Sequence, residues 1–128
     1  MSPQHLARAA VEGMLCNSAD ALDVLRARGV EVNRVFLLGA AGRLEAVRHI
    51  APQLFGVPVV VPPPGAHAAR GAARQAAWAL AGTPEPPRWE LPGAVTVAPD
   101  AEHDLAVGSA VRQQYRAARE QIHPETAD

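Results

Sequence analysis

Four adjacent small residues, Gly39-Ala40-Ala41-Gly42, form the part of this sequence whose spacing most suggests chemistry. They follow an apolar run at residues 35–38, typical of a strand buried on both faces, and precede a helical pattern at residues 43–55. A turn of small residues between a parallel strand and a helix lets a flat ligand lie against the backbone beyond the carboxyl end of the strand. The same turn also suits tight packing of helix on strand, so spacing alone leaves both interpretations open.

Two other groups have the residue types of active sites. Glu102-His103-Asp104 could supply metal ligands, but adjacent residues in a strand or loop rarely converge on one ion, so we interpret them as a solvated loop. Cys16 and Ser18 have no histidine placed to activate them as nucleophiles. The sequence therefore predicts neither a catalytic residue nor a metal site.

The charges are balanced, and this argues against polyanionic partners. The chain has 12 basic residues, all of them arginine, and a net charge of −1, so we predict no general attraction to nucleic acid. Arg112, Arg116 and Arg119 share one face of a predicted helix and could contact phosphate, but the neighbouring Glu120 favours an ordinary solvated face. With one cysteine and no apolar run of signal-peptide or membrane-spanning length, we expect a cytoplasmic protein that does not enter a membrane.

The elements that must position the small-residue turn follow from the same periodicities. Ser2 and Pro3 begin a helix that runs to about residue 28 and ends at Gly29, and a second apolar strand covers residues 57–61. A helix of mostly small residues at 66–81 is predicted to approach the sheet closely, with Trp78 as its large anchor and Trp89 as a second core anchor. Further along we expect an extended crossing at 82–92, a short extended piece at 95–97, a last helix at 106–121 and a flexible tail at 123–128.

Three segments in register resemble the C-terminal domain of the FGGY carbohydrate kinases, most closely its bacterial xylulokinases. The central one is residues 39–52 (GAAGRLEAVRHIAP) with residues 55–62 (FGVPVVVP). Upstream, residues 5–13 (HLARAAVEG) are similar to the second half of the family's C-terminal signature. Downstream, residues 69–76 (ARGAARQA) resemble the small-residue helix after its second strand. The resemblance covers roughly residues 3 to 120.

The resemblance implies an α/β fold, a partial actin-like (ribonuclease-H-like) domain in which a short parallel two-strand core is flanked by helices. It implies that residues 1–122 are the C-terminal ATP-binding segment of a kinase that, when complete, converts D-xylulose and ATP to D-xylulose 5-phosphate and ADP with Mg²⁺. Gly39, Ala40, Ala41 and Glu45 would border the adenosine pocket. The family's general-base aspartate and sugar-binding domain have no counterpart in these 128 residues, so we expect no activity from the chain alone.

The ligand-facing positions depart from the family pattern. Relatives usually carry three glycines where this chain has Gly39-Ala40-Ala41, and we expect the added methyl groups to weaken or abolish ATP binding. Leu44 replaces a serine able to cap the following helix, and Ala66 and Arg70 stand where acidic residues are usual. The alternative is therefore a non-catalytic interaction or remnant domain. Because the strands that precede this segment in the family are missing here, we expect a homodimer or a complex with a kinase N-terminal half.

Overall fold

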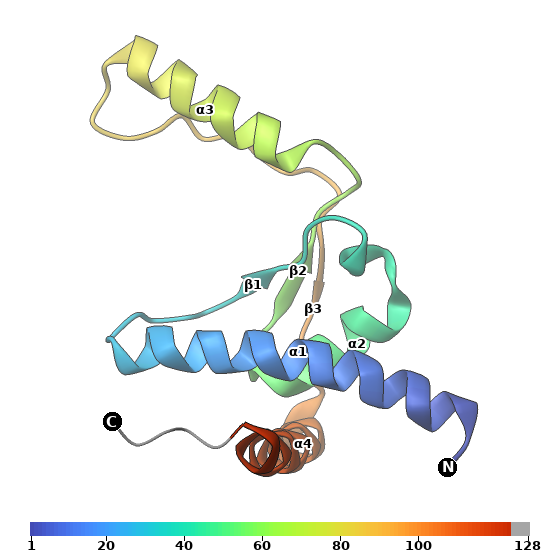
Figure 1. The fold of residues 1–128 in the computed structure, drawn as a ribbon. Helices are drawn as coiled ribbons and strands as arrows, with labels where there is room; N and C mark the ends of the chain where they lie inside the picture. The colour runs from blue at the N-terminus through green and yellow to red at the C-terminus, as the bar shows by residue number, and fades with distance from the viewer. Residues whose placement is uncertain (124–128) are drawn as a thin grey trace.

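The computed structural model describes residues 1–123, apart from the side chain of Ala101, as four α-helices and a small mixed sheet (Figure 1). A single 3₁₀ turn, η1, lies between the first strand and the second helix. In chain order the elements are α1 (Pro3–Ala27), β1 (Val35–Phe36), η1 (Ala41–Arg43), α2 (Glu45–Phe55), β2 (Val59–Val61), α3 (His67–Ala81), β3 (Val95–Val97) and α4 (Ala101–Ile122). The predicted tail lies outside the described residues except for His123.

The sheet has the order β1-β2-β3. The predicted parallel core is confirmed, because Val35 pairs with Val59 in parallel register, and β3 extends it by pairing antiparallel to β2. Both parallel strands are shorter than predicted. Pro58 has no N–H to donate to a ladder, and after Leu37 the chain turns away into Gly39, whose φ is +77°.

Helix α1 begins as the sequence predicts. Ser2 caps it in a capping box with His5, and Pro3 occupies the first turn. The helix ends at Ala27, and Gly29 follows with φ +81°. Its middle section packs on α2 and buries three side chains, those of Leu15, Cys16 and Ala19.

Helix α2 lies at the centre of the core. It buries an apolar set against α1, α4 and the sheet: Val47, Ile50, Ala51, Leu54 and Phe55. The helix begins two residues later than predicted, because residues 41–43 form the 3₁₀ turn. Its N-cap residue Leu44 makes no side-chain hydrogen bond, as expected for leucine at a position that favours a hydroxyl. Gly56 ends it with φ +68°.

Helix α4 corrects two predictions. It starts at Ala101, five residues earlier than predicted, so Glu102 and Asp104 lie in its first turn, where carboxylates favour the helix dipole, and not in a loop. The predicted solvated arginine face is also wrong. Arg116 Nη2 lies 2.6 Å from Asp23 Oδ2 and Arg119 Nη1 lies 2.6 Å from Asp20 Oδ2, both on α1, while Arg112 also pairs with Asp23. This ionic cluster joins the two long helices.

The cluster makes stability depend on pH at acid values. Burial alone would raise the pKa of Asp23, but its hydrogen bond and charge contacts with Arg112, together with Arg26 and Arg116, lower the pKa overall. A lowered folded-state pKa adds stability that is present above the unfolded value of about 3.9 and is lost as pH falls through the folded value. We expect Asp23→Asn to unfold more easily than the parent at pH 7, by about 1 kcal/mol because the carboxylate is partly exposed.

Chemical denaturation at a series of pH values checks this expectation. The difference between the parent and Asp23→Asn should shrink as pH falls below about 4. Asp100→Asn is the matched control, since the Asp100 side chain makes no capping hydrogen bond. A difference that is constant down to about pH 2 would show that the cluster contributes nothing through ionisation.

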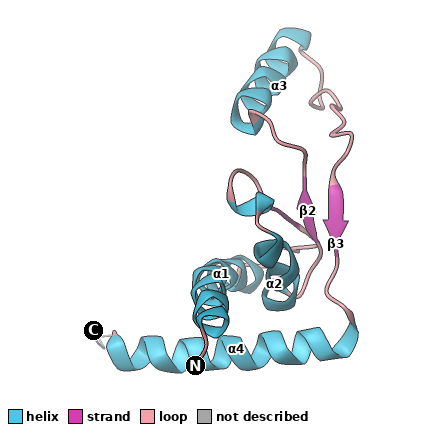
Figure 2. Ribbon diagram, turned by 90° about the vertical axis from the view of Figure 1, so that its right-hand side faces the viewer, coloured by secondary structure: helices cyan, strands magenta, loops and turns pink. Residues whose placement is uncertain are grey.

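Helix α3 projects away from the rest of the molecule (Figures 1 and 2), and this contradicts the prediction that it packs closely on the sheet. No residue of α3 is buried. Trp78 is not a core anchor, because it lies outside the buried core. Its Nε1–H donates instead to Thr83 O, just beyond the end of α3, at 2.6 Å. Trp89 is 39% exposed and stacks with Arg70, so it is not a core anchor either. Alanine-rich sequence specifies the helix but offers little apolar area to hold it against the sheet.

Candidate functional site

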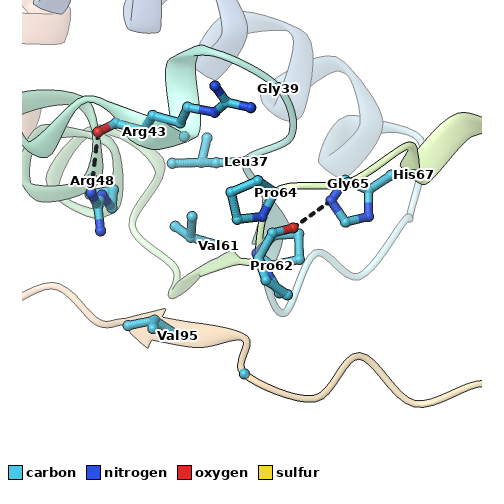
Figure 3. A pocket seen from close by; sticks show the side chains of 13 residues that line it. Leu37, Gly39, Arg43, Arg48, Val61, Pro62, Pro64, Gly65, His67 and Val95 are labelled. Atoms are coloured by element: carbon cyan, nitrogen blue, oxygen red, sulfur yellow. Dashed lines mark hydrogen bonds between the residues drawn. The ribbon is translucent and has the colours of Figure 1, made fainter.

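A pocket of about 240 Å³ lies at the carboxyl ends of β1 and β2 (Figure 3). Leu37 and Val61, at the ends of the two parallel strands, form its apolar wall together with Val95 at the start of β3. The rest of its lining comes from the turn after β1, the proline-rich segment after β2, the starts of α2 and α3, and the turn before β3: Gly39, Gly42, Arg43, Arg48, Pro62, Pro63, Pro64, Gly65, His67 and Gly93. Open α/β sheets bind ligands in this position.

The two glycines of the predicted turn serve different purposes. Gly39 has φ +77° and open space around it, so its backbone conformation favours glycine. Gly42 is buried, and a Cβ built there would lie 2.7 Å from Leu37 O, so a side chain would push α2 away from β1. Both glycines line the pocket, but Gly39 is required by its backbone conformation and Gly42 by close packing against Leu37.

The structure brings one of the four predicted pocket residues, Gly39, to the lining. Ala40 is exposed at the N-cap of η1, and Ala41 packs against the core. The Glu45 side chain is 86% exposed and lies 3.8 Å from His49 Nε2 on the surface of α2. Ala40, Ala41 and Glu45 thus stand around the turn and not in the pocket that it borders.

The pocket lining includes three cationic or titratable side chains that the sequence analysis did not identify, those of Arg43, Arg48 and His67. Arg43 extends toward Gly39 in Figure 3, and Arg48 Nη2 donates to Arg43 O at 3.2 Å. Arg48 Nε is buried and has no hydrogen-bond partner among the described residues. His67 Nε2 lies 3.0 Å from Pro63 O, which holds the segment after β2. Arg43 directly follows the turn and Arg48 lies in the first half of α2, and hydrophobic periodicity does not mark either position as functional.

The lining therefore combines an apolar wall with two guanidinium groups. It includes no carboxylate side chain. Such a site can hold a flat, electron-rich or anionic group, because arginine stacks on rings and donates to anionic oxygens. It offers no carboxylate general base for removing a proton from a sugar hydroxyl.

The other sequence candidates have structural explanations. Cys16 is 1% exposed, and burial raises the pKa of its thiol, which keeps it protonated and unreactive. Asp104 accepts a hydrogen bond from Gln53 Nε2 at 3.1 Å and another from Asp100 N–H at 2.8 Å, so it ties α4 to α2. Residues 1–123 contain no group of three side chains able to hold a metal ion. Among the helices of this described part, none is long and apolar enough to cross a membrane.

The fold and the pocket define a class of protein, namely an α/β domain with a small pocket at the carboxyl ends of its parallel strands. Comparison with known families is more specific. The FGGY family of carbohydrate kinases, C-terminal domain, matches residues 1–80, which is more than half of the 128 residues. This chain belongs to the FGGY family of carbohydrate kinases and corresponds to a part of their C-terminal domain.

A solved structure agrees with this assignment. The crystal structure of xylulose kinase from Bifidobacterium adolescentis matches 93% of this chain with a TM-score of 0.71 and 40% sequence identity. The chain spans 22% of the length of that kinase. No curated protein matches the sequence. The family resemblance and the α/β fold class predicted from the sequence are confirmed.

Proposed function

We propose that this chain forms the adenosine side of the nucleotide site of an ATP-dependent sugar kinase of the xylulokinase type. The observation that carries the proposal is the pocket at the carboxyl ends of β1 and β2, bordered by the Gly39–Gly42 turn, in a chain of this family. The kinase reaction would be phosphoryl transfer from ATP to D-xylulose or a similar ketose, with Mg²⁺ neutralising phosphate charge.

The chemistry of the lining supports a nucleoside more than a whole triphosphate. The apolar wall of Leu37 and Val61 offers a surface for the face of a purine, and the two guanidinium groups offer donors to its polar edge or to the ribose. The volume of about 240 Å³ lies below the usual range of about 300–1,000 Å³ for complete small-molecule sites. The phosphates and the sugar would be held by other parts of a kinase.

Nucleotide titration followed by NMR tests the proposal. We expect ATP, ADP and adenosine to move the amide signals of Gly39, Ala40 and Ala41 to similar extents, because the chain contributes little to phosphate binding. The double variant Ala40→Gly/Ala41→Gly should bind a few-fold more tightly, because glycine widens the backbone conformations open to the turn that borders the pocket, although neither methyl group lines the pocket itself. Ala72→Gly/Ala73→Gly, at two exposed positions of helix α3, is the matched control and should leave the affinity for nucleotide unchanged.

No shift at millimolar nucleotide in either the parent or the double-glycine variant would contradict a surviving pocket. That result would favour the second candidate, a non-catalytic interaction domain that keeps the kinase scaffold. The second candidate is favoured by one feature of the site, namely that its lining includes no carboxylate for proton transfer.

Assembly is a separate prediction of the proposed function. Leu6, Met14 and Leu25 on α1 are 63%, 51% and 45% exposed, and apolar side chains this open on one long helix favour a partner. We expect a homodimer, or a complex when a kinase N-terminal half is supplied. Light scattering after gel filtration at micromolar concentration measures this directly. A mass of 13.5 kDa with cooperative melting, unchanged when the kinase half is added, would contradict it.

A further inference from the structure

The Arg43 guanidinium is available to a ligand in the pocket at the ends of β1 and β2. Arg43 lines this pocket, and in Figure 3 its side chain extends toward Gly39. Within residues 1–123 the side chain forms no hydrogen bond and no ion pair. The carboxylate of Glu45, two residues further along the chain, lies 3.8 Å from His49 Nε2 instead. All the N–H donors of the Arg43 guanidinium can therefore serve a ligand.

The backbone that carries this side chain is held in place. The Arg43 N–H donates to Ala40 O at 3.0 Å, and the Arg43 carbonyl accepts a hydrogen bond from Arg48 Nη2 at 3.2 Å. The preceding residue, Gly42, is buried against β1, where a built Cβ would lie 2.7 Å from Leu37 O. Because the backbone is fixed before a ligand arrives, binding has to order only the side chain of Arg43, which lowers its entropic cost.

Arginine distinguishes purines by the groups on their edges. A guanidinium is a planar fork of N–H donors with no acceptor. Guanine and hypoxanthine present two adjacent acceptors, N7 and O6, so arginine bonds both at once, whereas adenine presents N7 beside the N6 amino group, which is a donor and suits glutamine or asparagine. An arginine at the edge of adenine would therefore make one of its two hydrogen bonds and would place two donors against each other.

The other polar side chains of the lining do not change this chemistry. Arg48 also has donors only. His67 Nε2 lies 3.0 Å from Pro63 O, and because a carbonyl oxygen only accepts, Nε2 carries the proton and Nδ1 is left as an acceptor. In Figure 3 the His67 ring lies on the far side of Pro64 from Leu37 of the apolar wall. A purine whose face rests on that wall therefore meets the guanidinium groups.

We propose that Arg43 determines the base specificity of the pocket, and that the pocket binds 6-oxopurine nucleosides, such as inosine and guanosine, more tightly than adenosine. This inference rests on the proposed function, because it takes the pocket to be the nucleoside site. A guanidinium also binds phosphate, but the apolar wall of Leu37 and Val61 suits the face of a ring and not a phosphate group. Arg43 would then favour a 6-oxopurine nucleoside triphosphate as the phosphoryl donor.

Titration with free nucleosides, followed by the amide signal of Gly39 in NMR spectra, tests the proposal without a phosphate group. Inosine should bind about tenfold more tightly than adenosine, and 7-deazaguanosine, which lacks the N7 acceptor, about tenfold more weakly than guanosine. Arg43→Gln should reverse the preference, because a glutamine amide offers one donor and one acceptor to adenine. Arg28→Gln is the matched control, since Arg28 is also exposed but does not line the pocket, and it should leave the preference unchanged.

The contrary outcomes separate this inference from the proposed function. Equal binding of inosine and adenosine, or a preference that survives in Arg43→Gln, would overturn the inference and leave the nucleoside site standing. A preference for adenosine that is lost in His67→Phe would give the edge contact to His67 Nδ1 instead. Tighter binding of ADP than of adenosine that is lost in Arg43→Gln would place Arg43 at a phosphate. No shift with any nucleoside would overturn both the inference and the proposed function.

Discussion

The 128-residue chain, mixed with ATP, Mg²⁺ and D-xylulose, is expected to release no ADP above background. The pocket lining provides no carboxylate base for the sugar hydroxyl, and the chain spans 22% of the solved xylulose kinase. General acid–base catalysis contributes about 10²–10⁴-fold and positioning of the two substrates contributes more, so the rate should fall at least about 10⁴-fold below that of a complete kinase. This is the largest effect that we expect.

A coupled assay of ADP release with several ketoses and polyols measures this. The complete xylulose kinase is the positive control. Gly42→Glu disrupts the turn that borders the pocket, because a Cβ at Gly42 would lie 2.7 Å from Leu37 O, so activity that survives in that variant comes from a contaminating kinase and not from the chain. A parent turnover of about 1 per second or more that is lost in Gly42→Glu would contradict the account.

The largest effect on stability is expected at Gly108, where α4 crosses α2. A Cβ built at this glycine would lie 2.0 Å from Gln53 O and 2.6 Å from Gln53 C, closer than any real contact. Backbone of the central core helix cannot move aside cheaply, so Gly108→Ala must separate the two helices. We expect a loss of about 3 kcal/mol, at the upper end of overpacking costs, and a melting temperature lower by about 10 °C.

The control for this change is a glycine-to-alanine substitution that is expected to raise the free energy of unfolding. Gly13 lies within α1 and has nothing within 4 Å of a built Cβ, so Gly13→Ala should stabilise the chain by up to about 1 kcal/mol through helix propensity alone. Thermal melts of the parent and both variants decide the matter. If Gly108→Ala melted at or above the parent temperature, α4 would not pack on α2 as the structure has it.

The local elements were predictable where one short stretch of sequence carries its own signal. The apolar runs that became β1 and β2, the capping residues Ser2 and Pro3, and the terminating glycine at position 29 each act within a few residues. The start of α4 was missed because Glu102, His103 and Asp104 carry no apolar periodicity, although two carboxylates in a first turn favour a helix.

Long-range contacts were not predictable from periodicity. Asp23 and Arg116 are 93 residues apart in the chain, so nothing local marks their pairing. The helical character of α3 follows from its alanines, but its position off the sheet depends on what surrounds it. Gly39 could be predicted as a pocket residue from the strand-to-helix turn. His67 could not, because its place in the lining depends on the conformation of the segment after β2, where its ring contacts Pro63 O.

Intermolecular nuclear Overhauser effects between adenosine protons and the methyl groups of the chain test the central claim most directly. The Ala40→Gly/Ala41→Gly variant is the suitable protein, because it should bind most tightly. The account predicts contacts from the adenine ring to the methyl groups of Leu37 and Val61, which face the pocket, and none to Val60 on the other face of the sheet. Contacts to Val60 with none to Leu37 and Val61 would contradict the assignment of this pocket to adenosine.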